Sequence, residues 1–218
     1  MAKHPAKFSD VFIPIFADAL KGYKKVYDPM AGTGKLGKIK SYGYEGEVYC
    51  NEIEPEWVDY SFGVDQWYVG DASSMPHIAD SYFDAICTSP TYGNRMADHF
   101  EAKDESHRIT YRHYLGRVLN KNNTGRMQWG KKYRKVHEDI YLECKRVLCD
   151  KGLFILNVSD HIRKGEIIKV SDWHKNTLIG MGFICFSDEK IKIPRMGFGA
   201  NSALRVDHER VMMFYSGG

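Results

Sequence analysis

The sequence predicts an α/β protein built on an open, doubly wound and mostly parallel sheet. Two observations lead to this fold class: short apolar runs alternate with helix-like stretches along most of the chain, and glycine or acidic residues directly follow several of those runs. Strands that alternate with helices form parallel sheets covered by helices on both faces. With 218 residues and 43% hydrophobic residues, the chain is expected to form one packed domain, residues 1–218.

The first half of the chain is expected to hold two helices and four short strands. One helix is predicted over residues 11–20, where Pro14 falls in the first turn and its missing N–H is tolerated. A second helix can form over residues 34–42. Strands are predicted where apolar residues cluster in short runs, at residues 25–27, 48–51, 67–69 and 83–87.

The second half holds the clearest helix and the clearest strand. The helix is expected over residues 133–148, because Val136 and Ile140 recur at the spacing of one helical face. Gly152 is expected to break the chain before the apolar strand at residues 153–158. The remaining elements are a helix over residues 173–181 and strands over residues 182–186 and 211–215.

A glycine turn from Asp28 to Gly34 (DPMAGTG) directly follows the first strand. Glycines let a backbone turn sharply and approach a ligand closely, and a strand–turn–helix unit presents main-chain amides to that ligand. Gly32, Gly34 and Gly37 also match the G-x-G-x-x-G spacing of dinucleotide sites, although an ordinary turn can have the same sequence. A phosphate-binding P-loop is excluded, because Pro29 stands where that motif needs glycine.

Acidic residues follow the next two strands. Glu52 ends the second strand, 18 residues beyond Gly34 and near the ~20 residues expected for an acid that binds ribose hydroxyls. Asp71 follows the third strand. Ligands of such sheets bind at the carboxyl ends of the strands, so these features together favour a cofactor that contains a nucleoside.

Residues 95–135 form a basic segment that interrupts the alternation. The segment contains eleven Lys or Arg and four Asp or Glu, a net charge of +7, so the rest of the chain carries −4. Cations meet phosphates and amide groups can reach bases, which predicts a nucleic-acid-binding insertion that recognises the target. A solvated charged surface is the alternative. The candidate nucleic-acid contacts are Asn94, Arg95, Arg108, Arg112, Arg126 and Gln128.

The cysteines and apolar runs exclude several other classes of protein. The five cysteines are odd in number and no pair has Cys-x-x-Cys spacing, so neither a disulfide framework nor a zinc site is indicated, and no other metal site is recognised. The longest apolar runs fall far short of the ~20 residues that a membrane span needs. The cytoplasm is therefore the expected location.

Thr88 to Gly93 (TSPTYG) follows the fourth strand and, together with the glycine turn, resembles a family of methyltransferases. These are the S-adenosylmethionine-dependent amino-methyltransferases that modify adenine N6 or cytosine N4 in DNA, and they pair a D-P-x-x-G-x-G turn with a (D/N/S)-P-P-(Y/F) loop. His4 to Phe8 is similar to a third family segment, and Val48 to Trp57 looks like the second strand and its acid. The resemblance implies a Rossmann-like methyltransferase sheet with the basic insertion after its fourth strand.

The resemblance implies a role for each matching residue. S-adenosylmethionine would be the cofactor and DNA the partner. Ser89 and the Pro90 carbonyl would accept hydrogen bonds from the target amine, while Tyr92 would stack on the extruded base. The implied cofactor residues are Lys7, Asp28, Met30, Gly32 and Gly34 at the methionine part, Glu52 at the ribose, and Ile53 and Asp71 at the adenine.

The implied chemistry needs aligned acceptors but no protein nucleophile. An exocyclic amine is a poor nucleophile because its lone pair is delocalised into the ring, and two acceptors on its hydrogens can localise that pair. Cytosine C5 methylation is excluded, since it needs a cysteine nucleophile and no cysteine here follows a proline. Within the family that the sequence resembles, serine at this position is more typical of the cytosine-N4 group, so the resemblance favours cytosine N4 over adenine N6. Thr91 departs from the family's second proline, which puts the rigidity of the loop in question.

Three other functions stay open at this point. A methyltransferase that acts on a base in RNA would share the same loops. A catalytically inactive nucleic-acid-binding protein of the same fold would keep the basic segment without turnover. A dinucleotide oxidoreductase would explain the glycine turn, but no residue in the sequence suggests a hydride-transfer site.

Overall fold

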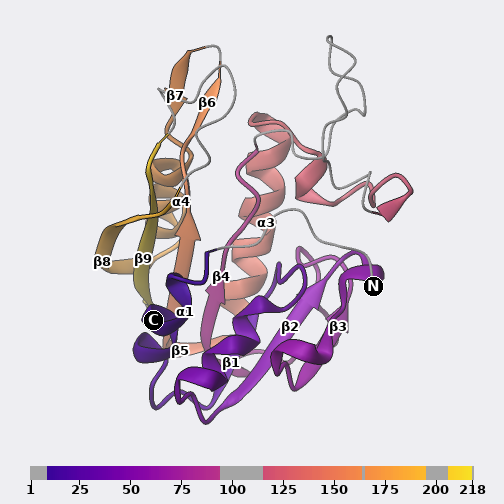
Figure 1. Ribbon diagram of the computed structural model, residues 1–218, viewed down its shortest axis with the longest axis vertical. Helices are drawn as coiled ribbons and strands as arrows, with labels where there is room; N and C mark the ends of the chain where they lie inside the picture. The colour runs from indigo at the N-terminus through magenta and orange to yellow at the C-terminus, as the bar shows by residue number, and fades with distance from the viewer. Residues whose placement is uncertain (1–8, 94–114, 164, 195–205, 218) are drawn as a thin grey trace.

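The structure, a computed structural model, describes residues 9–93, 115–163, 165–194 and 206–217. Within them the main sheet has seven strands in the order β3-β2-β1-β4-β5-β9-β8 (Figure 1). The strands are β1 Lys25–Asp28, β2 Glu47–Glu52, β3 Gln66–Val69, β4 Phe83–Thr88, β5 Leu148–Val158, β8 Phe183–Lys192 and β9 His208–Ser216. Strands β1 to β5 pair in parallel, whereas β9 runs antiparallel to both of its neighbours.

The order of the strands reverses between β1 and β4. From β1 the chain adds β2 and then β3 on one side, and it returns to pair β4 with the other side of β1. In open parallel sheets the carboxyl edge at such a reversal is where ligands bind. The glycine turn after β1 and the loop after β4 both start at this point.

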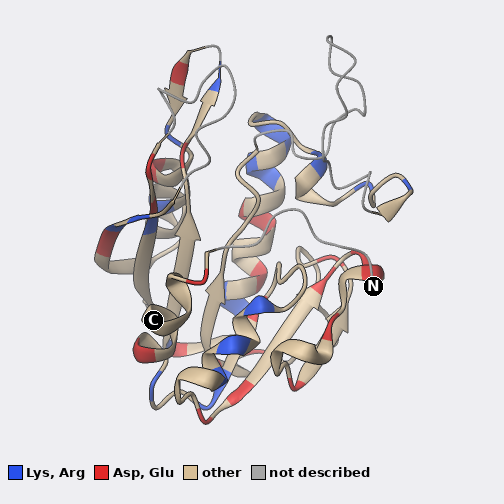
Figure 2. Ribbon diagram, in the orientation of Figure 1, with Lys and Arg blue, Asp and Glu red and all other residues tan. Residues whose placement is uncertain are grey.

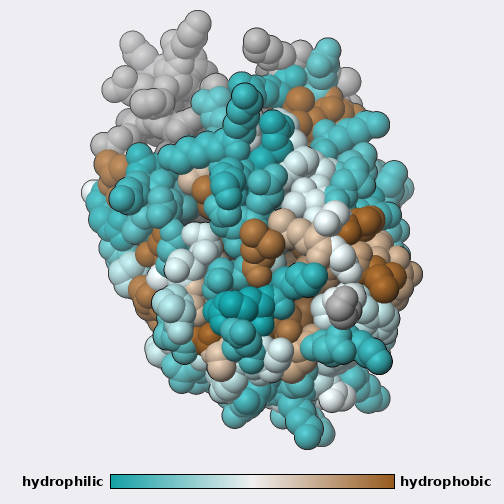
Figure 3. Space-filling view, turned by 180° about the vertical axis from the view of Figure 1, so that it is seen from behind, coloured by the Kyte–Doolittle hydropathy of each residue, from teal (hydrophilic) through white to brown (hydrophobic). Residues whose placement is uncertain are grey.

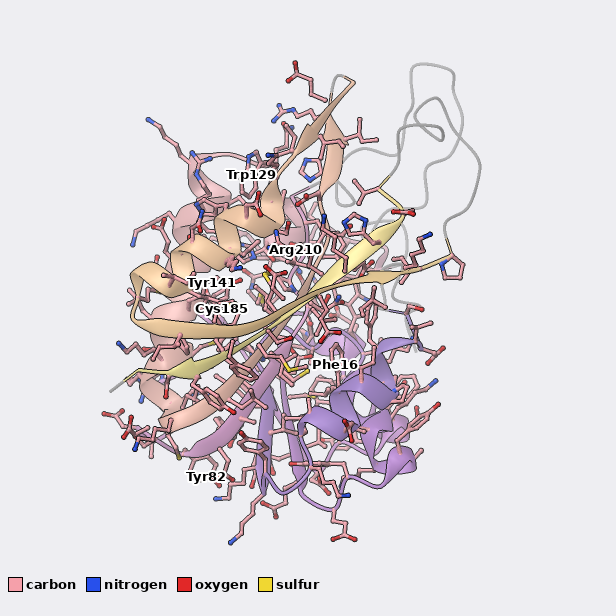
Figure 4. The ribbon with its side chains drawn as sticks, turned by 90° about the vertical axis from the view of Figure 1, so that its left-hand side faces the viewer. Phe16, Tyr82, Trp129, Tyr141, Cys185 and Arg210 are labelled. Atoms are coloured by element: carbon pink, nitrogen blue, oxygen red, sulfur yellow. The ribbon has the colours of Figure 1, made fainter. Side chains whose placement is uncertain are left out.

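Helices cover both faces of the sheet, as the sequence predicts. The helix α1 and the 3-10 helix η1 pack on one face, and α3 and α4 pack on the other. Figure 4 shows this division, with Phe16 of α1 and Tyr141 of α3 on opposite sides of the strands. The helices are α1 Phe12–Ala19, η1 Lys35–Tyr42, α3 Lys131–Val147 and α4 Val170–Gly180, and shorter 3-10 helices are η2 Pro55–Trp57, η3 Tyr60–Phe62 and η4 Thr124–Arg126.

Two predictions about local structure need correction. The helix expected at residues 34–42 is a 3-10 helix, and it is packed tightly: a Cβ on Gly37 would lie 2.4 Å from the Phe62 carbonyl oxygen. Gly152 does not break the chain, because β5 already begins at Leu148. The irregularity is absorbed inside the strand, where Lys151 adopts a left-handed φ of 56° and the register against β4 shifts.

A second, two-stranded sheet has no counterpart among the predicted elements. Its strands are β6 His161–Arg163 and β7 Glu166–Ile168, which pair antiparallel and project beyond the carboxyl edge of the main sheet (Figure 1). Each strand is only three residues long and carries charged residues, so the sequence shows no apolar run there. The hairpin nevertheless lies beside the site, because Arg163 donates to the Trp129 carbonyl at 3.3 Å.

The predicted basic insertion is described only in part. Residues 95–114 lie outside the described residues, and residues 131–135 belong to α3 rather than to an insertion.

Seen from behind, the surface is largely hydrophilic, and its apolar side chains gather in a few places (Figure 3). Among the described residues, no helix has both the length and the apolar content of a membrane span.

Candidate active site

A direct hydrogen bond joins the ends of β1 and β4. Thr88, the last residue of β4, donates its hydroxyl to Asp28 Oδ1 at 2.7 Å, and the Met30 backbone N–H donates to the same oxygen at 3.1 Å. The glycine turn and the Ser89–Tyr92 loop therefore start from adjacent points of the same edge. This juxtaposition is the spatial requirement of the predicted site.

Asp28 lies in an apolar setting. It sits opposite Cys50 in the sheet register and is only 2% exposed. Burial raises the pKa of Asp28 to about 7, although the hydrogen bonds from Thr88 and Met30 oppose the shift. A positive charge placed beside this carboxyl group would restore its ionised form, so the end of β1 is suited to a cationic ligand.

Glu52 ties the end of β2 to the glycine turn. Its Oε2 accepts the Gly32 backbone N–H at 2.8 Å, and its Oε1 accepts the Glu54 N–H at 3.0 Å. Burial raises the pKa of Glu52 to about 8, against the lowering effect of those backbone hydrogen bonds. Each carboxylate oxygen still has a second lone pair for a hydroxyl group of a ligand. Ile53, which follows Glu52, is half-buried.

Asn51 positions this corner and was not among the predicted site residues. Its side-chain amide donates to the Pro29 carbonyl at 3.1 Å and to the Gly70 carbonyl at 3.0 Å, which connects the glycine turn to the turn after β3. The Asn51 Oδ1 and the Thr33 hydroxyl are buried and have no hydrogen-bond partner in the described part of the protein. The one signal in the sequence is an amide side chain inside a strand that is otherwise apolar.

Asp71 is held by its own turn and by the segment before α3. Its Oδ1 accepts the Ser73 N–H and hydroxyl at 2.9 and 2.8 Å, and its Oδ2 accepts the Asn122 side-chain amide at 2.7 Å. Asp71 thus occupies the predicted place at the end of β3. Asn122, which comes from residues 115–130, reaches the same carboxylate.

A clamp of polar contacts fixes residues 115–130 on the end of β2. Glu54 is 1% exposed, and its Oε1 accepts the Asn120 N–H at 2.6 Å and the Asn123 side-chain amide at 2.9 Å. Arg117 forms an ion pair with Glu54 at 2.7 Å and a two-pronged pair with Glu56 at 2.7 and 2.6 Å. Residues 115–130, part of the segment predicted to recognise the target, are therefore anchored beside the predicted cofactor residues.

The Ser89–Tyr92 loop is held by side chains from β5 and β9. Ser89 donates its hydroxyl to Asn157 Oδ1 at 3.2 Å, and Tyr92 donates to Glu209 Oε2 at 3.1 Å. Asn157 is fully buried and Glu209 is 5% exposed, while Pro90 between the two loop residues is also buried. Because the Ser89 proton is used by Asn157, the lone pairs of the Ser89 oxygen are available as acceptors.

The predicted nucleic-acid contacts fall into two groups. Arg126 and Gln128 lie on the surface in the segment before α3, where Arg126 donates to the Leu119 carbonyl at 2.9 Å and Gln128 accepts from Arg163 at 3.4 Å. Their predicted role in binding nucleic acid stays a prediction. The other predicted nucleic-acid contacts, Asn94, Arg95, Arg108 and Arg112, lie outside the described residues, as does the predicted cofactor residue Lys7.

Comparison with known proteins gives a fold but no family. No family model and no curated protein matches the sequence. Among solved structures, an S-adenosylmethionine-dependent methyltransferase from Methanosarcina mazei is 13% identical, with 94% of this chain and 97% of that chain covered and a TM-score of 0.57. The fold is that of the Rossmann-like methyltransferases.

Two further structures show how far this likeness extends. A protein from Pyrococcus horikoshii described as a candidate RNA methyltransferase is 16% identical, with 94% of this chain and 83% of that chain covered and a TM-score of 0.52. The [4+2]-cyclase SpnF is 14% identical, with 95% and 81% covered and a TM-score of 0.58. One fold thus accommodates different reactions, and the chemistry of this chain has to be argued from its own site.

Proposed function

We propose that this protein transfers a methyl group from S-adenosylmethionine to an exocyclic amine of a base in nucleic acid. DNA is the favoured substrate, and cytosine N4 is favoured over adenine N6. The observation that carries the proposal is the Thr88–Asp28 hydrogen bond, which places the glycine turn and the Ser89–Tyr92 loop side by side. A cofactor bound at the glycine turn would therefore lie next to a base held against the Ser89–Tyr92 loop.

The corner around β1 and β2 fits S-adenosylmethionine in charge and in hydrogen-bonding capacity. Asp28 and Glu52 are buried carboxyl groups with raised pKa values. The cationic methionine part of the cofactor would stabilise ionised Asp28, and the ribose hydroxyls would donate hydrogen bonds to Glu52. The Asn51 Oδ1 and the Thr33 hydroxyl oxygen, which have no hydrogen-bond partner among the residues that the structure describes, offer further acceptors. Met30, Gly32 and Gly34 would line the methionine part, Ile53 would pack on the adenine, and Asp71 would accept from its amino group.

When bound, S-adenosylmethionine supplies an activated methyl group, and the residues of the chain have to prepare the amine. The Ser89 oxygen and the Pro90 carbonyl would accept the two amine hydrogens and localise the nitrogen lone pair. Asn157 keeps the lone pairs of the Ser89 oxygen available, because its Oδ1 accepts the hydrogen bond from the Ser89 hydroxyl. Tyr92 would stack on the base once it has left the duplex, which offsets part of a cost of a few kcal/mol.

A basic surface beside the loop supports a polyanionic substrate. Lys131, Lys132, Arg134 and Lys135 occupy the first turns of α3, and the first turn holds no acidic residue (Figure 2). Cations at a helix N-terminus oppose the helix dipole, so helix stability does not explain Lys131, Lys132 and Arg134, whereas Lys135 forms an ion pair with Asp139 one turn along the helix. This surface adjoins the catalytic loop, since Trp129, just before α3, donates its backbone N–H to the Gly93 carbonyl at 2.9 Å.

A methylation assay with several nucleic acids tests the proposal. Purified protein and labelled S-adenosylmethionine would be incubated with duplex DNA, single-stranded DNA and RNA, and the products hydrolysed to identify the methylated base. We expect N4-methylcytosine in DNA, and loss of transfer with retained cofactor binding in Pro90→Ala and Tyr92→Ala. Transfer to RNA alone would replace the DNA substrate. Binding of cofactor and DNA without any transfer would favour the inactive binding protein instead.

A further inference from the structure

A buried chain of hydrogen bonds leads from α3 and α4 to the catalytic loop. Tyr141 and His174 Nδ1 are 2.6 Å apart, His174 Nε2 and the Tyr133 oxygen are 3.0 Å apart, and the Tyr133 hydroxyl donates to the Thr91 carbonyl. All three side chains have no exposed surface. Figure 4 shows Tyr141 within the helical layer and Trp129, next to the loop, at the edge that carries the β6–β7 hairpin.

Counting hydrogens fixes the direction of this chain. A carbonyl only accepts, so Tyr133 uses its single hydroxyl hydrogen on Thr91. His174 must then donate from Nε2 to the Tyr133 oxygen, which leaves Nδ1 to accept the Tyr141 hydroxyl. Burial holds the pKa of His174 well below its usual value, so the imidazole stays neutral and keeps this tautomer. Every hydrogen in this series of bonds points toward the loop, and Tyr133 is the donor that reaches it.

The end point of the chain is the peptide group between the two loop residues with proposed chemical roles. Thr91 lies between Pro90, whose carbonyl is a proposed acceptor, and Tyr92, which carries the stacking ring. Besides the Tyr133 bond, Thr91 uses its hydroxyl on Thr124 at 2.9 Å. Its backbone N–H has no hydrogen-bond partner among the described residues. Hydrogen bonds to side chains, rather than a proline ring, therefore hold this residue.

We propose that Tyr133, whose oxygen lies 3.0 Å from His174 Nε2, is a positioning residue that aims the Pro90 carbonyl and the Tyr92 ring by fixing the Thr91 peptide. The proposal rests on the proposed function for its effect on the reaction, but not for its effect on the loop. Core packing alone does not require these groups, because a phenylalanine would fill the same space without burying a hydroxyl. Tyr133 is the member of the chain that touches the loop.

Tyr133→Phe and Tyr141→Phe form a matched pair for the test. Each variant removes one buried hydroxyl that bonds to His174, and only Tyr133→Phe also releases Thr91. The readout of the loop is the exchange rate of the Trp129 backbone amide, which donates to Gly93, measured by NMR on the full chain with bound S-adenosylhomocysteine. We expect exchange at least tenfold faster in Tyr133→Phe and within threefold of the wild type in Tyr141→Phe. Equal acceleration in both variants would overturn the proposal.

The turnover of the same variants gives a second readout. Tyr133→Phe should lower kcat at least tenfold while KM for the cofactor stays within twofold, and Tyr141→Phe should leave both nearly unchanged. Thr91→Pro sacrifices no backbone hydrogen bond and fixes φ at residue 91. Adding it to Tyr133→Phe should therefore restore kcat to within threefold of Thr91→Pro alone. The same kcat loss for Tyr133→Phe in both backgrounds would contradict the positioning role.

The two readouts separate this inference from the proposed function. If the wild type methylates no nucleic acid, the proposed function fails, while the amide exchange of Trp129 still decides whether Tyr133 holds the loop. If the wild type methylates DNA but Tyr133→Phe changes neither exchange nor kcat, the proposed function stands and the positioning role is wrong. If Thr91→Pro by itself abolishes turnover, the amide exchange of the matched pair alone decides.

Discussion

The two halves of the candidate site are held in place by different kinds of contact. In the cofactor corner, Glu52 binds the backbone amides of Gly32 and Glu54, so neighbouring turns and strand ends hold one another. In the catalytic loop, the positioning groups come from distant parts of the chain: Ser89 bonds to Asn157, 68 residues away, and Tyr92 bonds to Glu209, 117 residues away. Local motifs thus define the first half, whereas the folded sheet and α3 define the second.

The largest expected effect comes from the loop half. Ser89→Ala should lower kcat by roughly 100-fold, the usual scale for loss of one group that stabilises a transition state through a hydrogen bond. The Kd for the cofactor should stay within twofold, because the Ser89 hydroxyl bonds to Asn157 and, among the described residues, forms no hydrogen bond with the glycine turn. Steady-state kinetics and isothermal titration calorimetry measure the two quantities.

Thr124→Val is the matched control for that variant. It removes the other hydroxyl contact of the loop, the one between Thr91 and Thr124, without touching the proposed acceptor. A loss of less than about tenfold in kcat is expected, since a neutral hydrogen bond contributes only ~1 kcal/mol. If both variants lost equal activity, the Ser89 oxygen would have no special role as an acceptor.

Asp28→Asn should weaken cofactor binding by roughly 30-fold, because a buried charge opposite a cation is worth about 2 kcal/mol. Asn can keep the bonds from Thr88 and Met30, since Oδ1 accepts both. Without cofactor the same change should stabilise the protein. The raised pKa of Asp28 means that its contribution to stability is present below about pH 4 and is lost as the pH rises through about 7.

Urea unfolding of the apo protein checks that sign. At pH 8.5 the free energy of unfolding of Asp28→Asn should exceed that of the wild type by about 2–4 kcal/mol, and at pH 5.5 the difference should shrink markedly. A variant that is less stable at both pH values would show that Asp28 is already ionised in the apo protein. The proposal that a cationic ligand ionises a neutral Asp28 would then be wrong.

A smaller effect is expected from pH itself. Cofactor binding to ionised Asp28 should release a proton, so affinity should rise roughly tenfold between pH 6 and pH 8. The comparison is made with Asp28→Asn, in which the rise should be clearly smaller, because titration of the cofactor's own amino group is common to both proteins. Parallel pH profiles in wild type and variant would exclude the linkage.

The smallest effect concerns the segment that joins the two halves. Asn122 occupies Asp71 Oδ2, the oxygen proposed to accept from the adenine amino group. Asn122→Ala should therefore tighten cofactor binding by about threefold, because the gain in binding free energy is less than that of one full hydrogen bond. Lys121→Ala, an exposed neighbour, should leave Kd unchanged. Weaker binding in Asn122→Ala would mean that the amide assists the cofactor instead of competing with it.

The sequence predicted the fold, and it predicted that the glycine turn and Glu52 lie at the same edge of the sheet, because both depend on short stretches of chain. The cofactor role of these residues stays a prediction. Buried strands such as residues 153–158 are apolar runs, and the glycine turn is one uninterrupted motif. The ion pair between Arg117 and Glu54 could not be predicted, since it joins residues far apart in a segment without periodicity. Asn157 and Glu209 could not be assigned to the site from the sequence for the same reason. They reach the Ser89–Tyr92 loop only when β5 and β9 pair beside β4.

The antiparallel course of β9 also determines which charge meets Tyr92. Alternate residues of a strand face opposite sides: Glu209 accepts a hydrogen bond from Tyr92, whereas the neighbouring Arg210 forms ion pairs with Asp172 of α4 and Asp188 of β8. A slip of one residue in the pairing of β9 would present a guanidinium to the catalytic loop in place of a carboxylate. The ion pairs of Arg210 involve no residue of the site. By helping to hold the register of β9, they keep a carboxylate rather than a guanidinium beside Tyr92.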